Sequence, residues 1–204
     1  LRPAMTVADL TGRVRRGEPI PWPAAALLTA CTPVVRAGML ARRMRAQITL
    51  DAHVISFGNL TAGGTGKTPA VIECARQKLE AGARVAVLTR GYGARHAGVP
   101  VVAGPETPVT PELAAVLGDE PALILRRAPG AIVVRHPDRV LAGRCAIELG
   151  CDTLILDDGY QYLRLCRDEN VLLVDATNPF GNGRLLPRGI LREPVGAADR
   201  KSVV

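Results

Sequence analysis

From residue 54 onward, short apolar runs alternate with stretches of helical spacing. Five apolar runs predict strands, at 54–57, 85–88, 131–134, 153–156 and 171–174. Helical spacing predicts helices at 70–80, 112–117, 122–127 and 137–149, and three of these stretches are followed by a glycine within two residues. This alternation is typical of an α/β protein, with a parallel sheet covered by helices on both faces.

Residues 21–46 combine an apolar stretch with a basic end. The arginines are Arg36, Arg42, Arg43 and Arg45. Two prolines, Pro23 and Pro33, interrupt the stretch, and we expect its uncharged part to be too short for the roughly 20 residues of a membrane-spanning helix. The pattern therefore predicts an N-terminal helix that lies on an acidic membrane surface. A core-packing helix with a solvated basic end is the alternative.

A glycine-rich loop joins the first predicted strand to the first predicted helix, in the sequence HVISFGNLTAGGTGKTP at 53–69. Strand, glycine loop, Lys-Thr and helix in this order predict a phosphate-binding P-loop. Backbone N–H groups and the helix N-terminus would face phosphate oxygens, with Lys67 on the β- and γ-phosphates and Thr68 on Mg²⁺. A plain glycine turn with a solvated lysine is the alternative. The predicted phosphate-binding residues are Thr61, Ala62, Gly63, Gly64, Thr65, Gly66, Lys67 and Thr68.

Charged residues follow three of the predicted strands. Arg90 follows the second strand, at the end where ligands of open parallel sheets bind, which makes it a candidate phosphate or substrate clamp or else an exposed turn residue. Asp157 and Asp158 follow the fourth strand, where a P-loop enzyme places its Mg²⁺-binding acid. Asp175 follows the fifth strand and is a second candidate for that acid. Each of these acids is also a residue type that forms turns.

Two further groups of charged residues have an open interpretation. Asp119 and Glu120 adjoin at a loop-to-helix junction, and on spacing alone a helix cap is the favoured interpretation. Arg184, Arg188 and Arg192 recur every fourth residue in a tail rich in glycine and proline. They are candidates for contact with an anionic substrate, and a solvated basic loop is the alternative.

Composition narrows the class of partner. The chain has 204 residues, enough for one domain or one domain plus an appendage, and a net charge of +7, which indicates nucleotide, nucleic acid or acidic lipid as partner. No aromatic stacking platform accompanies the arginines, which argues against nucleic acid. The five cysteines form no C-x-x-C pair, which argues against a zinc site or a disulfide framework. We find no convincing signal peptide.

Five motifs together resemble the tetraacyldisaccharide 4′-kinases, the lipid A 4′-kinase family. They are GNLTAGGTGKTP at 58–69, RGYG at 90–93, GDEP at 118–121, DDGYQ at 157–161, and GNGRLLP at 181–187 with LREP at 191–194. The resemblance covers roughly residues 22–194. The family shares the departure at Thr61 from the strict P-loop pattern, which has glycine there.

The resemblance implies an ATP-dependent kinase that transfers the γ-phosphate to the 4′-hydroxyl of a tetraacylated glucosamine disaccharide 1-phosphate in lipid A biosynthesis. It implies a P-loop NTPase-like sheet. It also implies that Asp119 is the catalytic base, that Lys67 and Arg90 stabilise the transferred group, and that the Mg²⁺ ligands are Thr68, Glu120, Asp157 and Asp158. The implied location is peripheral, on the cytoplasmic face of the inner membrane, with residues 1–50 as membrane-associating segment and 51–204 as kinase core.

The sequence departs from the family pattern in two ways. Tyr162 stands where the family commonly has histidine, so a role for that imidazole does not carry over. The resemblance also leads us to expect that the family's C-terminal lobe is absent or truncated. Two alternatives to the kinase therefore remain. One is a truncated, weakly active or inactive nucleotide-binding membrane module, and the other is a different P-loop NTPase.

Overall fold

The computed structural model describes residues 6–44, 46–63, 66–91 and 98–202. The chain forms two compact units. The first comprises Leu1–Met44, Asn59–Thr65 and Val174–Arg200, and the second comprises Arg45–Gly58, Gly66–Leu173 and Lys201–Val204.

A six-stranded sheet forms the centre of the second unit, with the strand order β3-β4-β2-β5-β1-β6. The strands are β1 (His53–Gly58), β2 (Val85–Thr89), β3 (Val101–Ala103), β4 (Ile132–Arg135), β5 (Thr153–Leu156) and β6 (Glu169–Leu172). All pairs are parallel except β3 with β4, which are antiparallel at one edge. The five predicted strands are present, but β6 ends two residues before the predicted run does, and β3 was not predicted.

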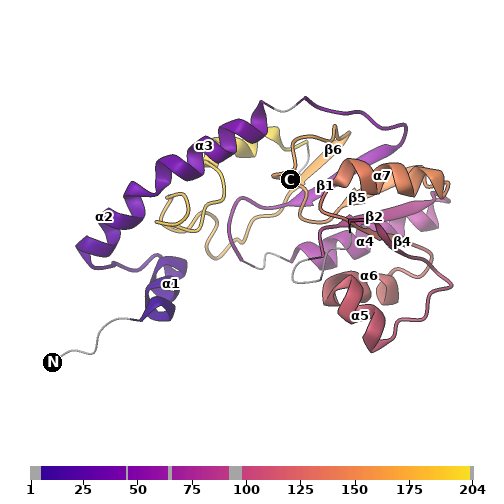
Figure 1. The fold of residues 1–204 in the computed structure, drawn as a ribbon, viewed down its shortest axis with the longest axis horizontal. Coiled ribbons are helices and arrows are strands. Elements are labelled where there is room, and N and C mark those ends of the chain that lie inside the picture. Colours follow the sequence, from indigo (N-terminus) through magenta and orange to yellow (C-terminus); the bar gives the residue numbers. More distant parts are fainter. Residues whose placement is uncertain (1–5, 45, 64–65, 92–97, 203–204) are drawn as a thin grey trace. The chain divides into compact units, whose positions relative to one another are not determined.

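Helices cover both faces of this sheet, which confirms the predicted α/β architecture (Figure 1). On one face, α4 (Lys67–Glu80), α5 (Pro111–Leu117) and α6 (Asp119–Arg127) pack against the side chains of Ile55 and Ile155. On the other face, α7 (Arg139–Glu148) packs against Val54 and Leu154. Neighbouring residues of β1 and β5 thus serve opposite cores, because successive side chains of a strand point to opposite faces.

The end of β1 makes a close backbone contact with the loop that follows β5. A Cβ atom on Gly58 would lie 2.6 Å from the Cβ and 2.8 Å from the backbone N of Tyr160, which is fully buried. The Gly159 N–H donates to the Phe57 carbonyl at 2.8 Å. Only glycine fits at position 58, so the residue at which the predicted P-loop begins is fixed against the loop carrying Asp157 and Asp158.

The first unit contains α1 (Val7–Arg16), α2 (Trp22–Ala30), α3 (Thr32–Arg43) and the 3₁₀ helix η1 (Val195–Arg200). We did not predict α1. Its N-cap Thr6 accepts from the Asp9 N–H at 3.1 Å, the Thr6 N–H donates to the Asp9 carboxylate, and Gly17 ends the helix in a left-handed conformation. Its stability therefore rests on capping as well as on the one buried residue, Val14.

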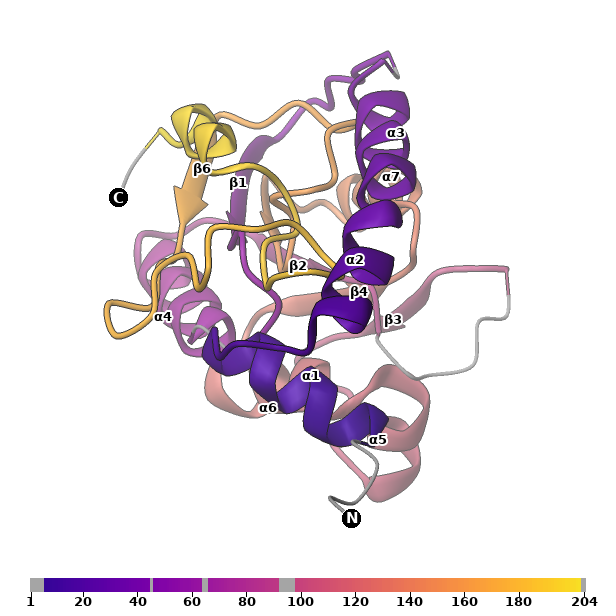
Figure 2. The same cartoon turned by 90° about the vertical axis from the view of Figure 1, so that its left-hand side faces the viewer.

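α2 and α3 follow one another as a nearly continuous rod (Figure 2). Pro23 and Pro33 lie in the first turns of these helices, where a missing N–H costs little. The 22 residues Trp22–Arg43 are by length and composition alone a candidate membrane span, once the arginines near their end are included; the uncharged part before Arg36 is shorter, as we expected. None of its residues is buried, and Trp22 is 81% exposed, which also goes against the core-packing alternative.

We predict that Gly58→Ala lowers the free energy of unfolding of the second unit by about 2 kcal/mol or more, because the new methyl group would overlap the backbone of buried Tyr160. Gly104→Ala is the matched control, since its nearest neighbour would lie 3.9 Å away, and we expect a change within about 0.5 kcal/mol. Urea denaturation followed by circular dichroism measures both. Equal effects of the two substitutions would contradict the close contact.

Candidate functional site

The carboxyl ends of β1, β2 and β5 bring the candidate residues to one edge of the sheet. In register, Leu156 lies opposite both Ser56 of β1 and Leu88 of β2. The next residues along these strands lead to the P-loop, to Arg90 and to Asp157. In open parallel sheets this edge is where ligands bind.

Lys67 is the first residue of α4 and contacts the acid pair after β5. Its Nζ lies 3.6 Å from Asp158 Oδ1, and its side chain is 14% exposed. Gly66 caps the helix in a left-handed conformation with φ 71°, which favours glycine. Because α4 begins at Lys67, both Lys67 and Thr68 lie in its first turn, where the positive end of the helix dipole is found.

The remaining predicted phosphate-binding residues are placed only in part. Gly64 and Thr65 lie outside the described residues, as do Tyr92 and Gly93 of the RGYG motif and Arg45 of the basic end. Thr61, Ala62 and Gly63 belong to the first unit, where Thr61 forms an antiparallel bridge with Leu191. The Ala62 N–H donates to the Ile190 carbonyl at 2.7 Å, so the role of this N–H toward phosphate stays a prediction.

Asp157 is a buried carboxyl group in an unfavourable environment for its charge. It is 4% exposed, and its pKa is raised to about 6, first by burial and then by the carboxyl groups of Glu120 and Asp158. Lys67 and Arg139 act in the opposite direction. Asp158 has a φ of 53°, and a non-glycine residue in this strained region is often found at functional sites. The arrangement therefore concentrates negative charge beside Lys67.

Asp119 and Glu120 lie in the exposed first turn of α6, and the cap interpretation was wrong. The N-cap is Gly118, and no side chain caps this helix. A Cβ on Gly118 would lie 3.9 Å from the Cα of Gly91, the residue after Arg90. The turn that carries the two acids therefore lies beside the turn that carries Arg90, and neither carboxylate is used as a cap.

Arg139 is a site residue that sequence reasoning did not single out. It is 3% exposed, its Nη1 donates to the His136 carbonyl at 2.7 Å, and its Nη2 donates to the Asp157 carbonyl at 3.4 Å. Burial lowers its pKa to about 10, Asp157 counters this shift, and Arg90 adds to it. A sequence signal was available, because a cation at the first position of a helix opposes the helix dipole and needs a compensating partner.

Arg167 was missed altogether, and it holds the loop that follows the acid pair. Its Nη1 donates to the Gly159 carbonyl at 3.2 Å and to Asn170 Oδ1 at 3.1 Å, and lies 3.4 Å from Ser56 Oγ. One side chain thereby ties this loop to β1 and β6. No sequence pattern that we used distinguishes such an inward-turned arginine from a solvated one.

Tyr162, which stands where the family commonly has histidine, has a local structural partner. Its hydroxyl donates to Asp138 Oδ1 at 2.7 Å, and the same carboxylate accepts from Arg164 Nη1 at 2.7 Å and caps α7. Asp175 accepts from the Thr177 N–H at 2.9 Å in the first unit, as a turn-forming residue does. This contact favours the turn interpretation of Asp175 over a metal-binding one.

The predicted Mg²⁺ ligands are oxygen donors, and as a set they suit a cation only if phosphate and water supply further ligands. Within the described part of the chain, no three histidine, cysteine or carboxylate side chains are placed to hold a metal ion on their own. Mg²⁺ is usually bound by one or two carboxylates together with phosphate oxygens and waters. The hydroxyl of Thr68 and the carboxylates of Glu120, Asp157 and Asp158 are oxygen donors, and the mutual repulsion of these acids is what such a cation would relieve.

Comparison with known proteins places this geometry in a family. Residues 19–204 match the model of the family described as Tetraacyldisaccharide-1-P 4′-kinase. The chain belongs to this family. It is 46% identical to the Tetraacyldisaccharide 4′-kinase of Anaeromyxobacter sp. (strain K), over 83% of this chain and 45% of that protein. With the protein of the same description from Pelobacter propionicus it shares 49% identity, over 87% of this chain and 49% of that protein.

Solved structures include a member of the same family. LpxK from Aquifex aeolicus, solved in complex with ATP, superposes with a TM-score of 0.69 at 32% sequence identity, over 88% of this chain and 54% of that one. The chain thus spans about half the length of the relatives that it matches.

We predict that Asp157 lowers stability at neutral pH. Its folded pKa of about 6 exceeds the ordinary 3.8, so the folded state holds a proton that the unfolded state has released between pH 4 and 6, and stability falls as pH rises through this window. We compare the unfolding free energy of Asp157→Asn with that of wild type in Mg²⁺-free buffer. The difference, variant minus wild type, should be roughly 2–3 kcal/mol larger at pH 7.5 than at pH 4.

Asp51→Asn is the matched control, since Asp51 is exposed in the same unit, and we expect it to change the unfolding free energy by no more than about 0.5 kcal/mol at either pH. Urea titrations at the two pH values measure all three proteins. If Asp157→Asn and wild type show the same pH dependence, Asp157 is not the group responsible.

Proposed function

We propose that the chain carries the ATP-binding and catalytic lobe of a kinase that transfers the γ-phosphate of ATP to the 4′-hydroxyl of a tetraacyldisaccharide 1-phosphate, in lipid A biosynthesis. Membership of the family supports this reaction, and the ATP in the LpxK structure supports the phosphate donor. The observation that carries the proposal is the position of Lys67. It stands at the start of α4, 3.6 Å from Asp158 and beside the buried Asp157.

In this proposal the residues 61–68 bind the phosphates of ATP. The N-terminal turn of α4 faces the phosphate oxygens, and the Lys67 ammonium neutralises charge on the β- and γ-phosphates. Thr68, Glu120, Asp157 and Asp158 would hold Mg²⁺, which when bound would supply positive charge against the phosphate oxygens. Arg167 and the contact of Gly58 with Tyr160 keep the acid pair at a fixed distance from Lys67.

The acceptor hydroxyl is activated from α6. Asp119 lies exposed in the first turn, and its carboxylate accepts the proton of the 4′-hydroxyl as the new O–P bond forms and ADP leaves with its own oxygen. Arg90 is exposed at the neighbouring turn and stabilises negative charge on the transferred phosphoryl group. Phosphoryl transfer requires alignment and charge neutralisation above all, and these residues supply both.

We also propose a peripheral location on the cytoplasmic face of the inner membrane, and the exposed surface of α2 and α3 supports the association with a membrane. Exposed apolar residues run along α2 and α3, including Trp22, Leu27 and Val34, and the last turn of α3 carries Arg42 and Arg43. An apolar helix with a basic end binds acidic lipid surfaces. We therefore assign residues 1–50 to membrane association and 51–204 to the kinase core, with the acylated disaccharide and the lipid surface as partners and no nucleic acid.

We predict that Lys67→Ala and Asp119→Ala each lower phosphate transfer by about 100-fold or more, because one removes the phosphate-facing cation and the other the base. The assay measures transfer from γ-labelled ATP to a tetraacyldisaccharide 1-phosphate in detergent micelles. Lys78→Ala, in the same helix as Lys67, and Glu112→Ala, on the helix before Asp119, are the matched controls, and we expect their rates to stay within about twofold of wild type.

The outcomes separate the alternatives. If wild type binds MgATP by calorimetry but forms no product, the chain is a nucleotide-binding module. Hydrolysis of ATP, or phosphate transfer to another acceptor with no transfer to the disaccharide, would identify a different P-loop NTPase. If no nucleotide binds, the P-loop interpretation itself is wrong.

A further inference from the structure

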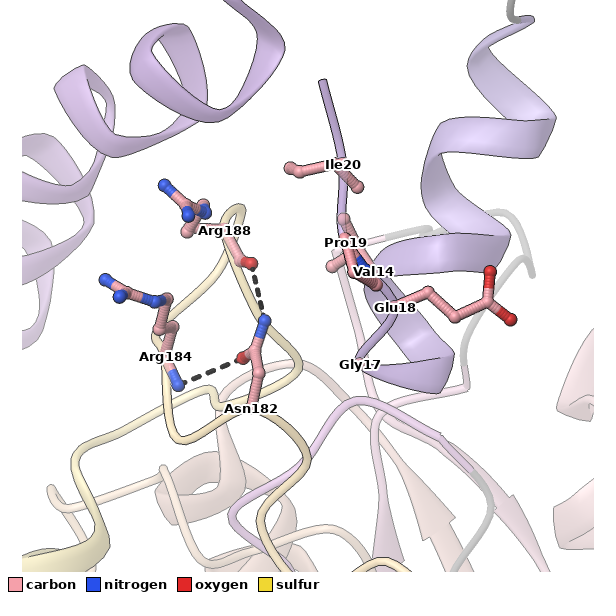
Figure 3. Close-up of a pocket in the computed structure, with 8 residues that line it drawn as sticks. All are labelled: Val14, Gly17, Glu18, Pro19, Ile20, Asn182, Arg184 and Arg188. Carbon is pink, nitrogen blue, oxygen red and sulfur yellow. Dashed lines mark hydrogen bonds between the residues drawn. The ribbon is translucent and has the colours of Figure 1, made fainter. Parts of the chain in front are cut away.

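A cavity of about 200 Å³ lies within the first unit, and no residue of the proposed kinase site lines it. Its lining comes from the end of α1, the segment after α1 and the loop 182–188 (Figure 3). The residues are Val14, Gly17, Glu18, Pro19, Ile20, Asn182, Arg184 and Arg188. Nothing in the proposed phosphate transfer uses this cavity.

The two sides of the cavity differ in chemistry. Val14, Pro19 and Ile20 form an apolar side, and Arg184 and Arg188 lie on the other side, with both guanidinium groups directed away from the apolar side (Figure 3). Glu18, the one acid in the lining, points away from them and is paired with Arg16 and Arg13 of α1. The cavity therefore has an apolar wall, and two arginines form its opposite rim.

Hydrogen bonds and a close backbone contact hold the loop that carries the two arginines. Asn182 Oδ1 accepts from the Arg184 N–H at 3.1 Å, and Asn182 Nδ2 donates to the Arg188 carbonyl at 3.1 Å. A Cβ on Gly189 would lie 2.1 Å from the Arg184 carbonyl oxygen, so the loop closes on itself at a position that only glycine fits. This closure fixes the backbone positions of Arg184 and Arg188 relative to each other.

The two arginines have different partners. Arg188 Nη1 donates to Thr29 Oγ1 at 2.7 Å and to the Ala25 carbonyl at 3.0 Å, which anchors it to α2. The Arg184 side chain makes no hydrogen bond or ion pair within residues 6–44, 46–63, 66–91 and 98–202, and it is exposed. One cation is thus held in place, and its neighbour has its full set of donors available to an anion.

Charge and exposed surface around the cavity indicate what that anion is. The first unit contains eleven arginines and five carboxylates, a net charge of +6 out of +7 for the whole chain. α2, to which Arg188 is bonded, carries the exposed side chains of Trp22 and Leu27. An anionic ligand whose other end is apolar suits both features. A volume of about 200 Å³ takes a head group, whereas pockets for drug-sized ligands hold about 300–1,000 Å³.

We propose that this cavity binds an anionic glycerophospholipid, with the phosphate at the rim on the exposed guanidinium fork of Arg184, Arg188 beside it, and the glycerol end in the cavity against Pro19 and Ile20. Arginine is suited to this task because its planar fork matches phosphate oxygens two at a time. The inference rests on the membrane-associating role proposed for residues 1–50, which supply the apolar wall, but it does not depend on kinase activity.

The test uses the full chain and vesicles of phosphatidylcholine with or without 30% phosphatidylglycerol, in the absence of ATP. Trp22 is the single tryptophan of the chain and lies exposed on α2, so its fluorescence reports binding. Wild type should prefer the anionic vesicles. Arg184→Gln should weaken that binding by about tenfold or more, as expected for loss of a charge-assisted hydrogen-bonded contact.

Two matched variants separate a site from general attraction. Arg184→Lys keeps the charge but loses the fork, so a site predicts at least about fivefold weaker binding, whereas surface attraction alone predicts binding equal to wild type. Arg36→Gln removes one exposed arginine of α3 outside the cavity, and its effect should not exceed the roughly fivefold loss expected for one surface charge.

A soluble probe separates a lipid from free phosphate. Dihexanoylphosphatidylglycerol below its micelle concentration should bind wild type by calorimetry at least about tenfold more tightly than inorganic phosphate, because only the lipid contacts the apolar wall. Equal binding of the two probes would overturn the lipid assignment. The lipid assignment is also overturned if both Arg184 variants bind anionic vesicles as tightly as wild type does, or if wild type shows no preference for anionic vesicles.

The kinase assay in neutral detergent micelles distinguishes this proposal from the previous one. A chain that binds anionic vesicles through Arg184 yet transfers no phosphate refutes the kinase alone. If Arg184→Gln instead raises the KM for the disaccharide about tenfold in these micelles while vesicle binding is unchanged, the cavity takes the phosphate of the acceptor and the lipid proposal is wrong.

Discussion

Asp157 carries a carboxyl group that burial and the neighbouring acids Glu120 and Asp158 make costly to ionise. Charged groups on several helices of the second unit raise or lower the free energy of ionising Asp157. α4 brings Lys67, α7 brings the buried Arg139, and α6 brings Glu120, which increases the repulsion. A folded protein tolerates such an arrangement when a ligand repays it, and strongly perturbed acids are concentrated at functional sites for that reason.

The loop that carries Asp157 and Asp158 is held by contacts with its backbone. Tyr160 packs so closely against Gly58 that no larger residue fits at position 58. Arg167 donates to the carbonyls of Gly159 and Tyr160, in the loop that follows β5. Asp158 keeps its left-handed backbone within this frame. These contacts fix the loop that carries the acids, in which Asp157 is buried and the Asp158 side chain is partly exposed beside Lys67.

Much of the second unit could be predicted, because strands buried on both faces read as continuous apolar runs. The acids after β5 and the lysine at the start of α4 were found for the same reason, since they directly follow recognisable elements. β3 was missed because three residues at an edge of the sheet lie in an irregular, proline-rich stretch. α1 was missed because it buries a single residue and is fixed by its caps.

Arg139 and Arg167 show a different limit. Periodicity tells which apolar side chains turn inward, but a buried arginine depends on carbonyl groups that tertiary structure brings to it. Pro23 and Pro33 show the same limit, because we took them as interruptions and they lie in the first turns of α2 and α3. A proline stops a helix in its interior and is harmless in its first turn, and sequence alone did not tell us which position each occupied.

The uneven distribution of charge has a consequence for how the protein meets its surroundings. Nearly all the excess positive charge belongs to the first unit, so the second is close to neutral. A negatively charged surface therefore attracts the first unit and hardly acts on the second, and it guides the first unit toward itself before any contact is made. This guidance works over a Debye length, about 8 Å at physiological ionic strength, and salt weakens it long before it disturbs the fold.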